Sequence, residues 1–150
     1  MAKPLLEIAK AVIQTEADSI LMLKDRIDQT LNDACQLILS CQGKVILIGM
    51  GKSGHIAKKI AATLASTGTP SFYVHPGDAG HGDLGMLNKK DVVTIISYSG
   101  ESDEIITLLP SIRRLDISVI SMTGNSSSTI AEDSDAVSYT HLTLPTILLV

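Results

Sequence analysis

Short runs of large apolar residues alternate along the chain with segments in which apolar residues recur every three or four positions. The runs are rich in valine and isoleucine. They predict strands at 44–48, 71–74, 92–96 and 117–122, with a fifth beginning near residue 135. Unbroken apolar strands that alternate with helices are typical of a parallel sheet buried on both faces. We therefore predict an α/β fold with a doubly wound parallel sheet of about five strands, flanked by helices.

The first forty residues carry a helical pattern ahead of the first strand. Apolar side chains from Ile8 to Ile38 recur mostly at intervals of three and four, with charged residues between them. This spacing predicts an N-terminal helical segment, residues 1–42, in two pieces. Its apolar stripe needs a partner, which can be the sheet, a second subunit or both, and we expect a homo-oligomer.

Composition and charge narrow the classes of partner. With 150 residues, of which 45% are apolar, the chain is expected to form one globular domain. Its formal charge of −4 and the lack of a basic block argue against nucleic acid and against an anionic membrane. No signal peptide and no apolar run of membrane-spanning length is visible. Cys35 and Cys41 are interpreted as ordinary reduced thiols, so we expect a cytoplasmic location.

A glycine-rich turn follows the first strand and carries one lysine and one serine, in the order Gly49-Met50-Gly51-Lys52-Ser53-Gly54. Such a turn between a strand and a helix presents backbone N–H groups to an anion. The three glycines also fit the dinucleotide-binding pattern, but the second strand ends in His75 where that pattern requires an acidic residue. A Walker A loop would require glycine at the position of Ile46. We therefore expect a bound phosphate that is not part of a nucleotide.

Two further polar segments follow the second and third strands. Residues 75–85 contain two histidines and four glycines and are predicted to form a long irregular loop. The third strand ends in Ser97-Tyr98-Ser99-Gly100-Glu101-Ser102. Ligands of parallel sheets bind beyond the carboxyl ends of the strands. The turns after the first and third strands are therefore expected to hold the same anion.

Five segments together resemble the sugar isomerase (SIS) domain, and more closely the D-arabinose 5-phosphate isomerases. They match in order and spacing over roughly residues 1–137, and they are 49–55, 65–70, 75–77, 81–86 and 97–102. The resemblance implies the flavodoxin-like sheet of SIS domains over residues 43–137. It also implies an isomerase that interconverts D-ribulose 5-phosphate and D-arabinose 5-phosphate without a cofactor. In that family the step feeds lipopolysaccharide or capsule synthesis.

The resemblance also implies roles by position. Lys52, His81 and Glu104 match positions that the family treats as catalytic. The matching substrate-binding positions are Ser53, Gly68, Thr69, His75, Ser97, Ser99, Gly100, Glu101 and Ser102. His75 also matches a residue that can take a divalent metal, which catalysis does not require. The implied substrate is a phosphorylated pentose.

The chemistry of the three catalytic candidates is consistent with these roles. Moving a proton between C1 and C2 of a sugar requires a base and a positive group that stabilises the enediolate. Glu104 can be the base, or only a first-turn carboxylate that complements its helix dipole. Lys52 can hold the enediolate or the phosphate, or be a solvated lysine. His81 can open the ring or shuttle protons, or be a plain exposed histidine.

The last residues, 138–150, depart from the family pattern. Family members continue with an acidic-cysteine-proline segment, another helix and a further catalytic histidine, whereas this segment carries no charged residue. We expect foreign sequence here, and we do not expect His141 to replace that histidine. The 150-residue chain is then expected to be marginally stable and weakly active. The alternative function is a non-catalytic sugar-phosphate sensor.

Overall fold

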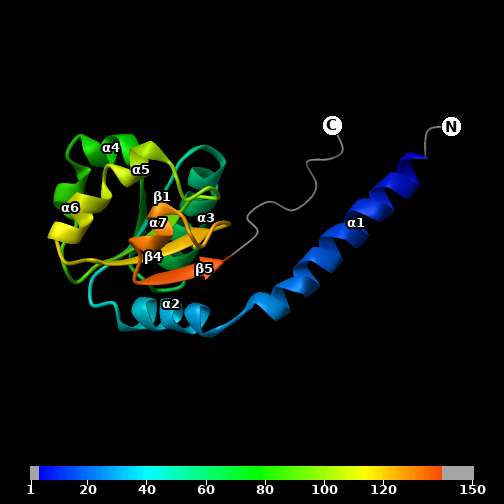
Figure 1. The fold of residues 1–150 in the computed structure, drawn as a ribbon, viewed down its shortest axis with the longest axis horizontal. Helices are drawn as coiled ribbons and strands as arrows, with labels where there is room; N and C mark the ends of the chain where they lie inside the picture. The colour runs from blue at the N-terminus through cyan, green and yellow to red at the C-terminus, as the bar shows by residue number, and fades with distance from the viewer. Residues whose placement is uncertain (1–3, 140–150) are drawn as a thin grey trace.

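The computed structural model describes residues 4–139 and contains a parallel sheet of five strands (Figure 1). The strands are β1 Val45–Gly49, β2 Ser71–Val74, β3 Val92–Ile96, β4 Ser118–Thr123 and β5 Ala136–Tyr139. Their order is β2-β1-β3-β4-β5, so the direction in which strands are added reverses between β1 and β3. This order is that of flavodoxin-like doubly wound sheets. The predicted fold class is confirmed.

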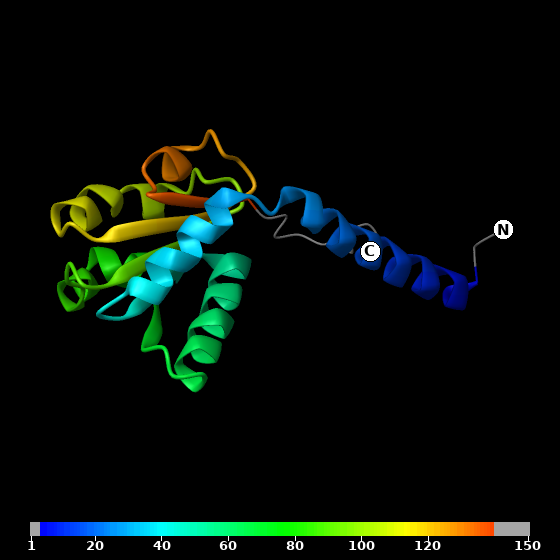
Figure 2. The same ribbon diagram turned by 90° about the horizontal axis from the view of Figure 1, so that it is seen from below.

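Helices cover both faces of the sheet (Figure 2). The α-helices are α1 Leu5–Met22, α2 Gln29–Ser40, α3 Gly51–Ser66, α4 Pro76–Gly80, α5 Asp103–Ile106, α6 Leu109–Arg114 and α7 Thr129–Glu132, and the 3-10 turns are η1 Leu23–Arg26 and η2 Asp83–Met86. On one face α2 contributes Ala34 and α3 contributes Ala57 to the core. On the other face Ile105, Ile112 and Ile130 from α5, α6 and α7 are fully buried against the strands.

The N-terminal segment divides into two helices as predicted, and these differ in their contacts. α2 begins after Asp28, whose carboxylate accepts the Thr30 N–H at 2.9 Å, and it packs on the sheet beside β5. α1 has no buried residue and extends away from the sheet in both views (Figures 1 and 2). Within residues 4–139, no helix combines the length and apolar character needed to cross a bilayer.

A buried carboxylate forms hydrogen bonds to the segments just before β1 and β3. Asp91 is 1% exposed and accepts the Lys44 N–H at 2.8 Å. It also accepts the Asn88 N–H at 2.9 Å and the Asn88 amide at 3.0 Å. The Lys44 ammonium lies 3.4 Å from the same carboxylate. Asp91 therefore satisfies backbone donors where two neighbouring strands begin.

Residues 75–85 correct one expectation, because they are not an irregular loop throughout. They form α4 and η2. Pro76 occupies the first turn of α4, where a backbone N–H is not needed, and His75 Nδ1 accepts the Gly77 N–H at 3.1 Å as a cap. Glycine content alone did not reveal this short helix.

Two further boundaries differ from the sequence pattern. The helical segment after β3 divides into α5 and α6, with Pro110 in the first turn of α6, since proline is compatible with a helix start. β5 extends past the expected boundary at residue 137: Ser138 pairs with Met122, and Tyr139 pairs with Thr123. The rest of the predicted tail, including His141, lies outside the described residues.

Candidate functional site

The sheet register brings the ends of β2, β1 and β3 to one level. Ile48 pairs with Val74 of β2, and Gly49 pairs with Ile96 of β3. Neighbouring strands lie about 4.8 Å apart, so the turns that follow them share one carboxyl edge. This edge includes the reversal between β1 and β3, which is where ligands bind in open α/β sheets.

The turn after β1 leads directly into the start of α3, a helix of 16 residues. Within the described chain, no side chain caps this start, so its first N–H groups are available to a ligand. Lys52 is exposed in the first turn and Ser53 is half-buried. Two predicted site residues and the positive end of a helix therefore lie beside the ends of β1 and β3.

Tyr73 of β2 holds this turn in place. Its hydroxyl donates to the Gly49 carbonyl at 2.8 Å, and Lys58 Nζ lies 4.9 Å from the centre of its ring. Burial, and then the negative charge of Asp78, raise the pKa of Tyr73, so the phenol remains a donor at neutral pH. A Cβ on Gly54 would lie 2.8 Å from the Gly49 carbonyl oxygen, so only glycine fits there. Sequence analysis missed Tyr73, because no spacing rule links a β2 side chain to the β1 turn.

The turn after β3 contains a short chain of hydrogen bonds. The Gly100 N–H donates to Ser97 Oγ at 3.2 Å, and Ser97 Oγ lies 3.0 Å from Ser102 Oγ. Because Ser97 is buried and already accepts one bond, we assign its hydroxyl hydrogen to Ser102. That assignment leaves the half-buried Ser102 hydroxyl able to donate to a ligand. Ser97 thus orders the turn, whereas Ser102 can contact an anion.

The other members of this turn are placed differently. Ser99 is exposed and its Oγ accepts the Glu101 N–H at 3.2 Å. Glu101, predicted to contact substrate, directs its carboxylate at the start of α7. There it accepts the Thr129 N–H at 2.7 Å and the Thr129 hydroxyl at 2.8 Å. Its oxygens already have partners in the protein.

His75 lies directly after β2, at the same edge. Its Nδ1 accepts the Gly77 N–H, which places the hydrogen of the neutral ring on Nε2. Metal ligation through Nε2 would require the other tautomer and the loss of that bond. Among residues 4–139, no three His, Cys, Asp or Glu side chains are grouped as metal ligands. The residues around His75 therefore do not fit a divalent metal.

The remaining catalytic candidates lie on neighbouring helices. His81 ends α4, Glu104 lies in the first turn of α5, and both side chains are exposed. α4 and α5 pack against each other, and both follow strands at the carboxyl edge. Lys52, His81 and Glu104 thus belong to the segments that follow β1, β2 and β3.

Gly68 and Thr69 are the predicted site residues that lie elsewhere. They follow the last turn of α3 and precede β2, whose first residue Ser71 is level with Val45, the first residue of β1. They are therefore at the amino edge of the sheet. The part of α3 from Ser53 to its end at Ser66 separates them from Ser53 by about 20 Å, at 1.5 Å per residue. One chain does not bring them to the same ligand.

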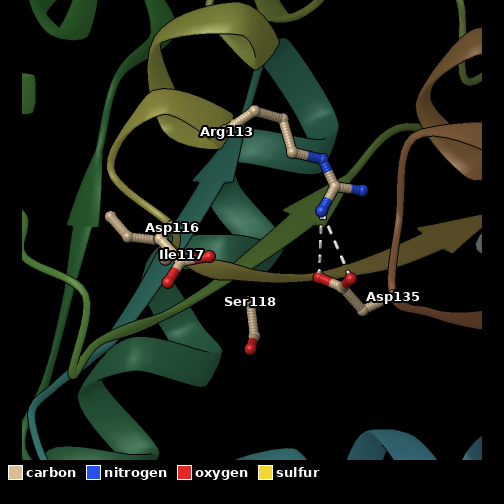
Figure 3. Close-up of a pocket in the computed structure, with 5 residues that line it drawn as sticks. All are labelled: Arg113, Asp116, Ile117, Ser118 and Asp135. Atoms are coloured by element: carbon tan, nitrogen blue, oxygen red, sulfur yellow. Dashed lines mark hydrogen bonds and ion pairs between the residues drawn. The ribbon is translucent and has the colours of Figure 1, made fainter.

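A polar pocket at this amino edge is a poor second candidate. Arg113, Asp116, Ile117, Ser118 and Asp135 line it (Figure 3). Asp135 accepts a hydrogen bond from Arg113 at 3.2 Å and one from the Val119 N–H at 2.7 Å. Burial opposes the charge of Arg113, but its ion pairs with Asp135 and Asp133 outweigh that effect and raise its pKa. Arg113 and Asp135 therefore already satisfy one another, which indicates a structural link between α6 and the residue before β5.

The sheet order defines a doubly wound α/β domain, and its carboxyl edge carries the uncapped start of α3 and the serine-containing turn after β3. Residues 38–146 match the model of the SIS domain family. The chain therefore belongs to the SIS domain family. This match runs past the boundary at residue 137 that the motifs alone indicated.

Individual relatives agree with this assignment. The arabinose 5-phosphate isomerase KdsD of Pseudomonas aeruginosa is 56% identical over 124 residues, which are 83% of this chain and 38% of the relative. KdsD of Yersinia pestis is 50% identical over 129 residues, 86% of this chain and 39% of the relative. A solved E. coli CFT073 protein in complex with arabinose 5-phosphate has a TM-score of 0.85 and 43% identity, covering 93% of this chain and 74% of that chain. The chain thus spans about two fifths of the KdsD relatives.

Proposed function

We propose that this chain is the sugar-phosphate-binding part of an isomerase that interconverts D-ribulose 5-phosphate and D-arabinose 5-phosphate. The carrying observation is that the uncapped start of α3 and the serine turn after β3 share one edge of the sheet. The names of the KdsD relatives, and the arabinose 5-phosphate in the E. coli complex, support the choice of pentose. In this proposal the α3 N–H groups, Ser53, Ser99 and Ser102 hold the phosphate.

The catalytic step in this proposal needs no cofactor. Glu104 takes the proton from C2 of the open-chain aldose and returns a proton to C1, which yields the ketose through an enediol. His81 opens the ring or moves the proton between the two sugar oxygens. Lys52 stabilises the negative charge on the enediolate or on the phosphate. His75 completes the sugar contacts through Nε2, since Nδ1 is already engaged.

The proposal includes a second copy of the chain. Gly68 and Thr69 can contact the same substrate only if another subunit supplies them, because both lie at the amino edge. α1, which has no buried residue, provides a surface on which two copies can associate. The product class, a phosphorylated pentose with an altered carbonyl position, is consistent with supply to lipopolysaccharide or capsule precursors.

Titration calorimetry tests the phosphate site. Arabinose 5-phosphate is expected to bind, whereas arabinose is expected to give no detectable heat, because each charge-assisted bond to phosphate contributes about 1.5–3 kcal/mol. Ser102→Ala should weaken binding, and Ser40→Ala, an exposed serine at the end of α2, serves as the matched control. Equal affinity for both sugars would overturn the phosphate assignment. Tight binding of NAD would instead support a dinucleotide site.

A further inference from the structure

The turn after β3 is held by the segment that follows β4. The Gly124 N–H donates to the Tyr98 carbonyl at 3.0 Å, and Thr123 Oγ1 donates to the same carbonyl at 3.2 Å. Further along both segments, the Ile130 N–H donates to the Gly100 carbonyl at 3.1 Å. We call residues 123–130 the β4 clasp. It fixes the backbone of the serine turn from the side of β4.

The tightest contact between the two segments is at Gly100. Its φ is +68°, a conformation that favours glycine, and a Cβ there would collide with the Ser128 side chain. Ser128 is fully buried, and its hydroxyl donates to the Asn125 carbonyl at 2.7 Å. Neither segment can shift at this point without disturbing the other.

Glu101 is the charged link between the turn and the clasp. Its two carboxylate oxygens accept the Thr129 N–H and the Thr129 hydroxyl, at 2.7 and 2.8 Å. The Thr129 N–H belongs to the first turn of α7, where no intrahelical acceptor exists. If the Glu101 carboxylate pointed at a bound phosphate, the two negative charges would repel each other. Its two hydrogen bonds to Thr129 instead hold the turn after β3 to the start of α7.

We propose that Glu101 is a positioning residue, not a substrate contact: through Thr129 it holds Ser99 and Ser102 in the geometry that binds the phosphate. This inference rests on the proposed sugar-phosphate site. It adds the Glu101–Thr129 pair, which sets the conformation of the turn after β3. Thr129 lies 28 residues after Glu101, beyond the five segments that carry the resemblance in the sequence.

The test compares Glu101→Gln, Thr129→Val and the double variant in the 150-residue chain. Thr129→Ser keeps the hydroxyl and is the conservative rescue, and Glu132→Gln, an exposed glutamate on α7, is the matched control. We expect Glu101→Gln and Thr129→Val each to weaken arabinose 5-phosphate binding by about tenfold at a temperature well below unfolding. The double variant should be no weaker than Glu101→Gln, because both changes break one link. Thr129→Ser and Glu132→Gln should bind like wild type.

Amide hydrogen exchange provides a readout that needs no ligand. In Glu101→Gln and Thr129→Val, the amides of Gly100, Glu101 and Ile130 should exchange more than about tenfold faster than in wild type. Unchanged exchange, or a lower melting temperature with unchanged affinity, would overturn the positioning role. Additive losses in the double variant would also overturn it. If the wild-type chain binds no sugar phosphate, the proposed function fails, and the exchange rates alone decide whether Glu101 holds the turn.

Discussion

At the scale of single residues, Gly100 makes the sharpest prediction for stability. Its positive φ and its contact with Ser128 leave no room for a Cβ. Gly100→Ala should lower the free energy of unfolding by about 2 kcal/mol or more, since the left-handed conformation alone costs about 1–2 kcal/mol. Gly85→Ala is the control, because a Cβ there meets nothing within 4 Å. Equal stability of the two variants in urea titrations would contradict this account.

Glu104 decides between acid–base chemistry and simple binding. Glu104→Gln keeps the shape and hydrogen-bonding capacity of the side chain but removes the base. Turnover should fall by about 10²–10⁴ while substrate affinity changes little. The assay is best made in this chain continued with the remaining sequence of the Pseudomonas aeruginosa relative, since the chain spans 38% of it. Turnover within a few-fold of wild type would show that Glu104 only complements the α5 dipole.

At the scale of elements, Asp91 stabilises the segments just before β1 and β3. Asp91→Ala removes the acceptor of three hydrogen bonds, including the Lys44 and Asn88 backbone N–H groups. The free energy of unfolding should fall by about 3 kcal/mol. Lys44→Met removes only the half-exposed ion pair and should cost less than about 1 kcal/mol. An equal decrease in the free energy of unfolding for both variants would mean that Asp91 stabilises the fold through its ion pair with Lys44 and not through its hydrogen bonds to the backbone.

Elements were predictable from the sequence where one physical signal was strong. The apolar run at 92–96 coincides with β3, because a parallel strand buried on both faces is apolar throughout. The run at 71–74 coincides with β2, which lies at the sheet edge and is only partly buried. α4 was missed, since its five residues are too few for a periodic pattern and glycine composition suggested a loop. The division between α5 and α6 also differs from the sequence pattern, and Pro110 lies in the first turn of α6, where proline is tolerated.

The candidate site was predictable only in part, for a related reason. Motifs mark the turns after β1 and β3, and the register shows that these turns are neighbours. The pairs Tyr73–Gly49 and Glu101–Thr129 join residues 24 and 28 positions apart, and no local pattern encodes such contacts. The separation of Gly68 and Thr69 from the other site residues likewise required the sheet topology.

At the scale of the whole molecule, the exposed apolar side chains of α1 lead us to expect self-association. Leu6, Ile13 and Ile20 are 76%, 69% and 57% exposed on a helix with no buried residue. Most of the stability of a helix in a protein comes from packing of its apolar face, so α1 needs a packing partner. Ile13→Gln combined with Ile20→Gln should therefore shift the chain toward monomer in sedimentation velocity. Thr15→Gln, on the same helix, should not. A wild-type chain that is monomeric at all concentrations would contradict the proposed second copy.

We expect the carboxyl edge of this sheet to support sugar-phosphate isomerisation. The most direct test of this expectation is nuclear magnetic resonance of arabinose 5-phosphate incubated in heavy water with this chain continued by the remaining sequence of the Pseudomonas aeruginosa relative. Ribulose 5-phosphate should accumulate to equilibrium, and deuterium should enter at the carbons between which the proton moves, because an enediol forms. Binding of arabinose 5-phosphate without interconversion and without deuterium entry would contradict the account and identify a sensor.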